Sequence, residues 1–241
     1  MSKREEMRKR RQQETRQRTL IVAGIIAVIA IGVAGFFIYQ SYENNRPVPA
    51  GSFVTVPTQT WPQADGKALG LATDKVVLQI FGDFQCSVCE EYFRSVEPQL
   101  MKDYVDTGKI RYEFHHFIVI DQNTGGTQSQ HAAEASECAN EQGHFWDYHN
   151  MLYTNQGAEG SDALADNRLK AFAAAIGLDT AKFNACFDSH RYASVVAADV
   201  ALGESKGVSG TPTLFLNGTM VSNPLDYNAL KQAIDLQLGA Q

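Results

Sequence analysis

The sequence predicts an α/β domain with a large helical insertion, preceded by one transmembrane helix. Two observations predict this fold class. A strand, turn, helix and strand pattern covers about 75–117, and a long, mostly helical interval separates it from a final hairpin and helix. Over 241 residues, a content of 44% hydrophobic and 10% aromatic residues is typical of a globular chain with a sizeable core, which excludes a disordered protein.

The N-terminal region combines a basic tail with an apolar run. Residues 1–18 contain eight Lys or Arg and three Glu, so the rest of the chain has a net charge of −11, against −6 overall. Residues 20–39 contain no charged residue, and a helix of this length spans about 30 Å, the hydrocarbon core of a bilayer. We therefore expect a cytoplasmic basic tail over 1–18 and a transmembrane anchor over 19–40.

A cleavable signal peptide and a buried soluble helix fit this region less well than an anchor. A signal peptide usually has an apolar stretch of roughly 7 to 15 residues and a small-residue cleavage site. This run is longer and ends in bulky residues that include Phe36 and Phe37, which indicates an uncleaved anchor. Nucleic-acid binding is disfavoured because the tail is short and three glutamates interrupt it.

The charges around the apolar run predict its orientation. Eight basic residues precede it and only Arg46 follows shortly after, so the positive-inside rule places the N-terminus in the cytoplasm. The rest of the chain is then extracytoplasmic, beginning with a proline-rich linker over 41–74. All four cysteines lie beyond the anchor, in a compartment where thiols can pair.

The domain expected over 75–241 alternates strands and helices. A strand ends at Phe81 and leads through a turn to Cys86, where a helix begins. The further elements expected are a helix to about 104, a strand over 110–117, a helical insertion over about 121–207, a strand over 213–216, a turn at Asn217-Gly218, a returning strand over 219–221 and a helix over 225–238.

The chemistry is expected at Cys86-Ser87-Val88-Cys89. Two cysteines separated by two residues at the start of a helix can form a reversible disulfide within one turn. The unpaired N–H groups and the dipole of the helix favour an anion there, so the pKa of Cys86 can fall from about 8.5 to roughly 3.5 to 7.5. Cys86 is the expected nucleophile and leaving group, and Cys89 the residue that resolves the mixed disulfide.

A metal site and an inert disulfide are the competing interpretations of the motif. Zinc normally needs two more soft ligands, often in a second closely spaced pair. Cys138 and Cys186 lie 48 positions apart, and the histidines do not complete a site. We therefore expect no metal and no cofactor.

The segment Phe81 to Cys89, with the pattern F-x-x-F-x-C-x-x-C, resembles the thioredoxin superfamily. The long helical interval before Gly210-Thr211-Pro212-Thr213, and the phrase from Cys138 to Trp146, resemble its DsbA-like branch. The resemblance covers about residue 76 to the C-terminus and implies a thioredoxin-like fold. It also implies a cis Pro212 facing the disulfide, with Thr211 contacting the sulfurs and binding substrate backbone.

The sequence departs from the family pattern in two places. Where the family often has an acidic residue, six positions before the first cysteine, this chain has Ile80. Asp83 is a candidate for proton handling, although a cap of the Cys86 helix is the preferred interpretation. The dipeptide Ser87-Val88 lacks the proline or histidine common in strong oxidases of the family.

Cys138 and Cys186 are expected to form a structural disulfide in an oxidising compartment. Two buried free thiols, or a relay to Cys86, are the alternatives.

The function that the resemblance implies is an extracytoplasmic thiol-disulfide oxidoreductase, preferably a dithiol oxidase acting on protein thiols. A DsbB-like or VKOR-like membrane protein is the implied redox partner. A reductase or isomerase, and a non-catalytic thioredoxin-like binding module, remain alternatives.

Overall fold

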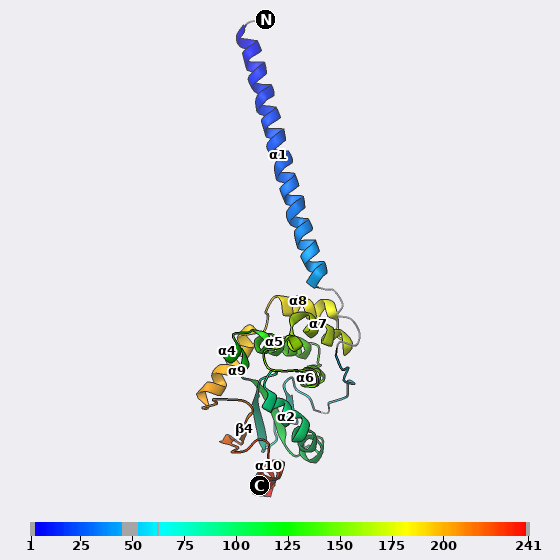
Figure 1. The fold of residues 1–241 in the computed structure, drawn as a ribbon, viewed down its shortest axis with the longest axis vertical. Coiled ribbons are helices and arrows are strands. Elements are labelled where there is room, and N and C mark those ends of the chain that lie inside the picture. The colour runs from blue at the N-terminus through cyan, green and yellow to red at the C-terminus, as the bar shows by residue number, and fades with distance from the viewer. Residues whose placement is uncertain (1–2, 45–52, 62, 240–241) are drawn as a thin grey trace. The chain divides into compact units, whose positions relative to one another are not determined.

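The computed structural model describes residues 3–44, 53–61 and 63–239, and the chain divides into two compact units, Met1–Arg46 and Pro47–Gln241 (Figure 1). In the first unit, α1 (Lys3–Asn44) is one continuous helix through both the basic tail and the apolar run. Its segment Ala23–Gln40 is long and apolar enough to cross a membrane. One candidate anchor therefore lies where the sequence predicts it.

The second unit contains the remaining elements. In chain order they are β1 (Ala68–Leu69), β2 (Val77–Gly82), α2 (Ser87–Ser95), α3 (Glu97–Leu100), the π-helical turn η1 (Met101–Val105), β3 (Arg111–His116), α4 (Ile120–Thr124), α5 (Gln128–Asn140), α6 (Phe145–Thr154), the 3₁₀ turn η2 (Asp162–Leu164), α7 (Asp166–Ala175), α8 (Thr180–Asp188), α9 (Ala193–Ser205), β4 (Thr213–Leu216), β5 (Thr219–Met220) and α10 (Tyr227–Gly239). The predicted α/β class with a helical insertion is confirmed.

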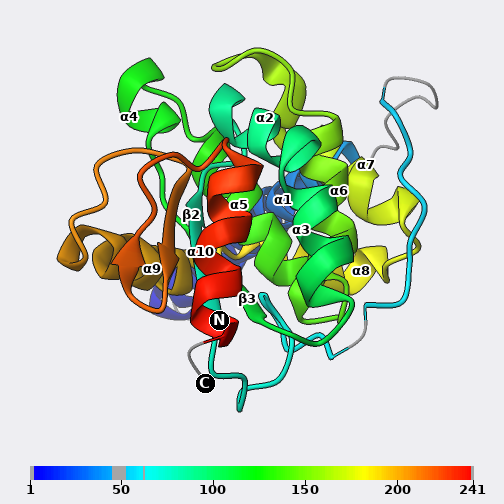
Figure 2. The same cartoon turned by 90° about the horizontal axis from the view of Figure 1, so that it is seen from below.

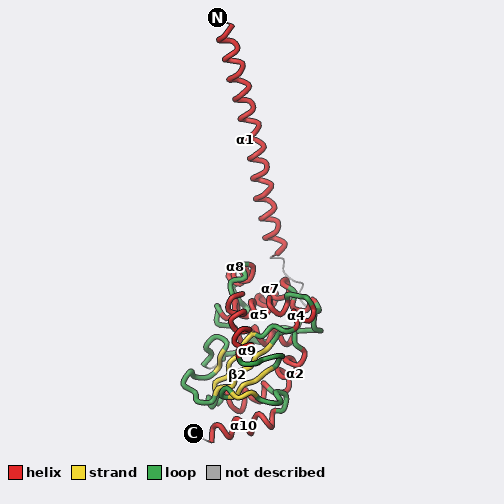
Figure 3. The backbone as a smooth tube through the Cα atoms, turned by 90° about the vertical axis from the view of Figure 1, so that its left-hand side faces the viewer, coloured by secondary structure: helices red, strands yellow, loops and turns green. Residues whose placement is uncertain are grey.

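The described strands form one five-stranded sheet in the order β1-β3-β2-β4-β5 (Figure 3). β2 and β3 are parallel, as a strand, helix and strand unit requires, and β4 runs antiparallel to β2. Ile80 lies opposite Leu214, and Phe81 opposite Thr213. This register puts the start of β4 beside the end of β2, where the turn to α2 begins.

The two faces of the sheet bury different side chains because alternate strand residues point in opposite directions. Leu78 and Ile80 belong to the main core together with residues of α2 and α10, and Figure 2 shows these two helices on the same side of the sheet. Phe81 and Phe215 belong to a smaller cluster on the other face. There α9 approaches so closely that a Cβ on Gly203 would lie 2.5 Å from the ring of Phe117.

The prediction that residues 41–74 form a linker is wrong for residues 53–61 and 63–74. Phe53, Val56 and Trp61 pack against the main core, and Trp61 donates a hydrogen bond to Asp147 of α6 at 3.0 Å. β1 then joins the sheet beside β3. Apolar side chains scattered among prolines pack against the helical insertion. The composition of this segment does not reveal such packing.

The rest of the predicted linker has two parts. Residues 41–44 belong to α1, and residues 45–52 and 62 lie outside the described residues. The domain therefore begins before residue 75, by position 53 at the latest.

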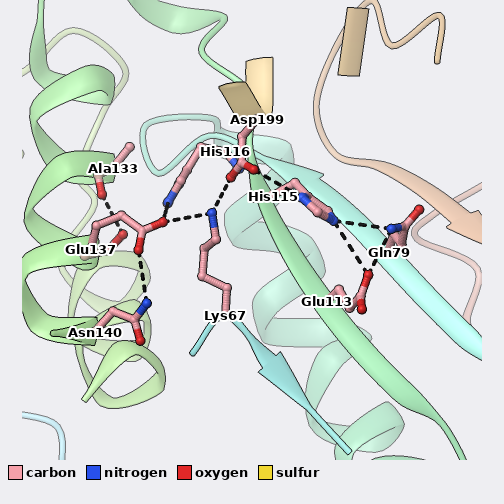
Figure 4. A network of polar contacts seen from close by, with 10 residues as sticks. Lys67, Gln79, Glu113, His115, His116, Ala133, Glu137, Asn140 and Asp199 are labelled. Atoms are coloured by element: carbon pink, nitrogen blue, oxygen red, sulfur yellow. Dashed lines mark hydrogen bonds and ion pairs between the residues drawn. The ribbon is translucent and has the colours of Figure 1, made fainter. Parts of the chain in front are cut away.

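A buried polar network ties the insertion to the sheet (Figure 4). The ammonium group of Lys67 contacts the carboxylates of Glu137 in α5 and Asp199 in α9, and His116 of β3 contacts Glu137 at 3.1 Å. Burial raises the pKa of Glu137, but the hydrogen bonds and charges of His116 and Lys67 outweigh burial and lower it to about 2. His116, Glu137 and Asp199 each have one side-chain nitrogen or oxygen atom of the kind that can bind a metal ion, and these three atoms lie within 4.8 Å of one another. The positive charge of Lys67 lies between the two carboxylates.

Candidate active site

The turn between β2 and α2 places Cys86 at the start of a helix. The N–H of Cys86 donates to the carbonyl of Asp83 at 3.1 Å, which closes the turn, and Cys86 is the N-cap of α2. Cys89 follows one turn later, in the core. Both are free thiols and both are buried, with exposed fractions of 5% for Cys86 and 1% for Cys89.

The start of β4 forms the wall beside these sulfurs. The Thr211–Pro212 peptide is cis, and the Cys86 sulfur donates to the Thr211 carbonyl at 3.3 Å. The Thr211 hydroxyl is buried and has no nitrogen or oxygen partner among the described residues, and its contact with the Cys86 sulfur lowers the pKa of Cys86. The structure thus brings together the four residues that the sequence singled out, although Thr211 and Pro212 lie far from the cysteines along the chain.

The two thiols have opposite pKa shifts. The Cys89 side chain donates a hydrogen bond that lowers the pKa of Cys86, whereas burial raises this pKa. The Thr211 side chain and the N–H groups of Cys89 and Val88 also lower it. The result is a pKa of about 6 for Cys86, against an ordinary 9.0. Burial raises the pKa of Cys89, and the nearby Cys86 sulfur adds to this effect. The pair therefore has one thiolate at neutral pH, on Cys86, and one protonated thiol.

Comparison with known proteins agrees with this geometry. A family model described as Thioredoxin matches residues 64–236, which include the turn, both cysteines and the cis proline. The chain belongs to the thioredoxin family. The crystal structure of oxidised BdbD from Bacillus subtilis is similar with a TM-score of 0.66 and 26% identity, over 72% of this chain and 93% of that one. The chain is thus a DsbA-like member of the superfamily, as the sequence predicted.

Sequence relatives fall into two kinds. Disulfide bond formation protein D of Bacillus subtilis is 28% identical over 175 residues, which cover 70% of the DsbA-like chain and 76% of that protein. The Na(+)/H(+) antiporter NhaA 3 of Salinispora tropica is 34% identical over 154 residues, 64% of this chain. The DsbA-like chain spans only 22% of the length of that antiporter.

The second cysteine pair of the DsbA-like chain lies in the insertion. Cys138 of α5 and Cys186 of α8 are joined by a disulfide, with their Cα atoms 5.9 Å apart. Each is only 1% exposed. This bond connects two helices of the insertion and is separate from the Cys86–Cys89 pair.

Asp83 does not cap the Cys86 helix, contrary to the sequence-based expectation. The side chain of the N-cap residue, Cys86, makes no cap hydrogen bond, and the Asp83 carboxylate accepts instead from the N–H groups of Gln85 at 2.8 Å and of Val119 and Ile120 at 2.9 Å each. Buried N–H groups at the start of α4 need an acceptor, and Asp83 supplies it from another element. Burial raises the pKa of Asp83, although these N–H groups oppose the rise. Proton handling by Asp83 stays a prediction.

Three polar contacts at the active-site turn come from a loop of the insertion that sequence patterns did not indicate. Gln156 donates to the Cys86 carbonyl at 2.8 Å, Glu159 accepts from Ser87, and the N–H of Gly160 donates to the Gln85 side chain at 3.1 Å. These partners lie far apart in the sequence, so no local pattern predicts the contacts. The pair Gly157 and Gly160 is the one local sign that the loop has a defined shape.

A buried carboxyl lies elsewhere than the family pattern suggests. Ile80 occupies the usual position and is buried in the core, whereas Glu97 is buried at the start of α3 and accepts a hydrogen bond from Tyr112 at 3.1 Å. Burial raises the pKa of Glu97 to about 8. At neutral pH the protein therefore holds a largely protonated carboxyl at the start of α3, directly after the active-site helix in the chain.

Proposed function

We propose that this chain is an extracytoplasmic dithiol oxidase that passes the Cys86–Cys89 disulfide to the thiols of other proteins. Its membership of the DsbA-like branch makes it a protein thiol-disulfide oxidoreductase, and the direction of transfer is the proposed part. One observation carries the direction: the pKa of Cys86 is lowered to about 6 while that of Cys89 is raised. A thiolate that is stable at neutral pH stabilises the dithiol form, which makes the disulfide a stronger oxidant.

The proposed reaction has two exchange steps. A substrate thiolate attacks the Cys86 sulfur, the Cys86–Cys89 bond breaks, and Cys89 leaves and takes up a proton. A second substrate thiolate then attacks the substrate sulfur of the mixed disulfide, and Cys86 leaves as a thiolate. The substrate loses two electrons and two protons to form a disulfide, and Cys86 and Cys89 become a dithiol. The cis Pro212 wall and the Thr211 backbone are the proposed contact for substrate main chain.

The proposed location follows from α1 and its charges. The helix is long and apolar enough for a single-pass anchor, and the excess of basic residues before the apolar run favours a cytoplasmic N-terminus. The domain would then lie in an oxidising compartment, where disulfides persist. The relative named disulfide bond formation protein D supports this proposal.

Turnover needs an oxidant that accepts two electrons from the dithiol. We propose a DsbB-like or VKOR-like quinone-linked membrane protein as this partner, since an anchored domain meets membrane proteins readily. The partner would re-form the Cys86–Cys89 disulfide through the same exchange chemistry in reverse.

The decisive experiment is the redox equilibrium of the full chain in detergent with glutathione, followed by alkylation of free thiols. We expect a potential closer to that of DsbA, about −120 mV, than to that of thioredoxin, about −270 mV. A potential at or below the thioredoxin value would contradict an oxidase and favour a reductase. A Cys86→Ser variant with full biological activity would contradict any redox function and leave a binding module.

A further inference from the structure

The loop between α6 and η2 has a defined shape above the active-site turn. Gly157 and Gly160 have φ values of +68° and +72°, in the left-handed region that side chains rarely adopt. A Cβ on Gly157 would also lie 2.6 Å from that of Ala163. Ala158 and Glu159 therefore lie between two positions at which the backbone conformation requires glycine.

Hydrogen bonds hold the loop on both sides of Glu159. Before it, Gln156 is buried and donates to the Cys86 carbonyl at 2.8 Å. After it, the N–H of Gly160 donates to the buried side chain of Gln85, which itself donates to Ser129 at 2.8 Å. The position of Glu159 is thus set by contacts with the residues around Cys86, even though its own side chain is exposed.

The Glu159 carboxylate lies at the N-terminus of α2. One of its oxygens accepts from the N–H of Ser87 at 2.9 Å and from the Ser87 hydroxyl at 2.8 Å. The next two N–H groups of the helix, those of Val88 and Cys89, stabilise the Cys86 thiolate and lower the pKa of Cys86. Two acidic groups, the Glu159 carboxylate and the Cys86 thiol, therefore share the donors of one helix terminus.

A helix N-terminus stabilises a negative charge nearby, and two like charges placed there destabilise each other. The Cys86 thiolate forms only in the dithiol state, whereas the Glu159 carboxylate is present in both redox states. Repulsion from Glu159 consequently raises the free energy of the dithiol form relative to the disulfide form. A less stable dithiol form weakens the tendency of the disulfide to oxidise other thiols.

We propose that Glu159 is a positioning residue that limits the oxidising strength of the Cys86–Cys89 disulfide by competing with the Cys86 thiolate for the N-terminus of α2. This inference rests on the proposed function and concerns how strongly that site oxidises. The other charges of this region are placed differently. Glu90 in the first turn of α2 pairs with Arg94, and the Asp83 carboxylate accepts hydrogen bonds from Gln85, Val119 and Ile120.

The test is Glu159→Gln in the full chain in detergent, because glutamine keeps an oxygen acceptor for Ser87 and removes only the charge. A titration followed by thiolate absorbance should give a pKa of Cys86 that is about 0.3 to 1 unit lower than in the native protein. The glutathione equilibrium should shift about two- to tenfold toward the dithiol, equivalent to roughly 10 to 30 mV more oxidising. Both shifts should shrink at about 1 M salt, because the Glu159 side chain is exposed.

The matched control is Glu91→Gln, which removes an exposed carboxylate from the second turn of α2. It should leave both measurements unchanged. Glu159→Asp keeps the charge and should stay within about twofold of the native equilibrium, which separates charge from loop structure.

Unchanged titration and equilibrium in Glu159→Gln would overturn the inference, as would equal shifts in Glu91→Gln or a shift toward the disulfide. These failures leave the proposed function intact, because the native protein would still titrate near pH 6. If instead the native Cys86 titrates near its ordinary value of 9.0 and Cys86→Ser remains active, the proposed function fails first.

Discussion

The two cysteine pairs of this protein differ in their position on helices and hardly at all in their exposure. Cys86, Cys89, Cys138 and Cys186 are exposed by 5%, 1%, 1% and 1%. Cys86 caps a helix, where N–H groups face its sulfur, whereas Cys138 and Cys186 lie within α5 and α8. Burial alone therefore does not distinguish a reactive cysteine from a structural one; the helix terminus and the cis-proline wall do.

The sequence spacing of the two pairs separates their mechanical roles. Cys86 and Cys89 belong to one helical turn, so their bond can open without releasing any other part of the fold. The other bond joins residues 48 positions apart and limits the unfolded states of the whole interval. The first pair is suited to exchange and the second to stability.

The largest expected effect is the loss of exchange in Cys86→Ser. Without the low-pKa sulfur no substrate mixed disulfide can form, so oxidation of a dithiol peptide should be abolished. Cys89→Ser should behave differently, because Cys86 still attacks disulfides and cannot be released; mass spectrometry should find trapped mixed disulfides. Mixed disulfides that form instead on Cys89 of the Cys86→Ser variant would reverse the assigned roles.

Removing the Cys138–Cys186 disulfide should lower the stability of the fold and leave the exchange chemistry unchanged. In the chain-entropy model, Cys138→Ser with Cys186→Ser should lower the free energy of unfolding by about 4 kcal/mol, measured by urea unfolding. The rate of peptide oxidation should stay near the native value under folding conditions. As a check on the bond, Cys86→Ser with Cys89→Ser should show no free thiol without reductant, and two free thiols would contradict the bridge.

The difference in pH dependence between the reduced and the oxidised protein should come from Cys86. Its lowered pKa stabilises the folded dithiol form fully above the ordinary thiol value of 9.0, and this stabilisation is lost as the pH falls through about 6. The difference in unfolding free energy between reduced and oxidised protein should therefore change between pH 6 and 9. Glu97, whose pKa is about 8, titrates in both redox states and therefore cancels in this difference. A difference that stays constant between pH 6 and 9 would contradict the assignment to Cys86.

The smallest expected effect is that of Thr211→Val, which keeps the shape of the side chain and removes its hydroxyl. The buried hydroxyl has no other partner among the described residues and helps to lower the pKa of Cys86. Valine should raise that pKa and shift the glutathione equilibrium up to about tenfold toward the disulfide, a change of about 1.4 kcal/mol. An unchanged equilibrium would show that the Thr211 carbonyl alone contacts the sulfur.

Local residues were enough to predict the reactive motif and most of the fold. The apolar strand before Cys86, the glycine turn at Asn217-Gly218 and the Ala-rich helices each depend on neighbours close in the sequence. The apolar run of α1 is likewise a property of consecutive residues. Such features are readable in a sequence because hydrogen-bonding pattern and side-chain period are local.

Only the tertiary structure decided what surrounds Cys86. Thr211 lies 125 positions from Cys86, and Glu159 lies 72 positions from Ser87. The contacts of Asp83 are also tertiary, because its carboxylate accepts from N–H groups at the start of α4. The segment after Phe53 likewise packs against a part of the chain that is distant in sequence. The sequence by itself was enough to predict Cys86 and Cys89 as the pair for thiol chemistry. Their pKa values depend on burial and on donors from distant segments, and these exist only once the chain has folded.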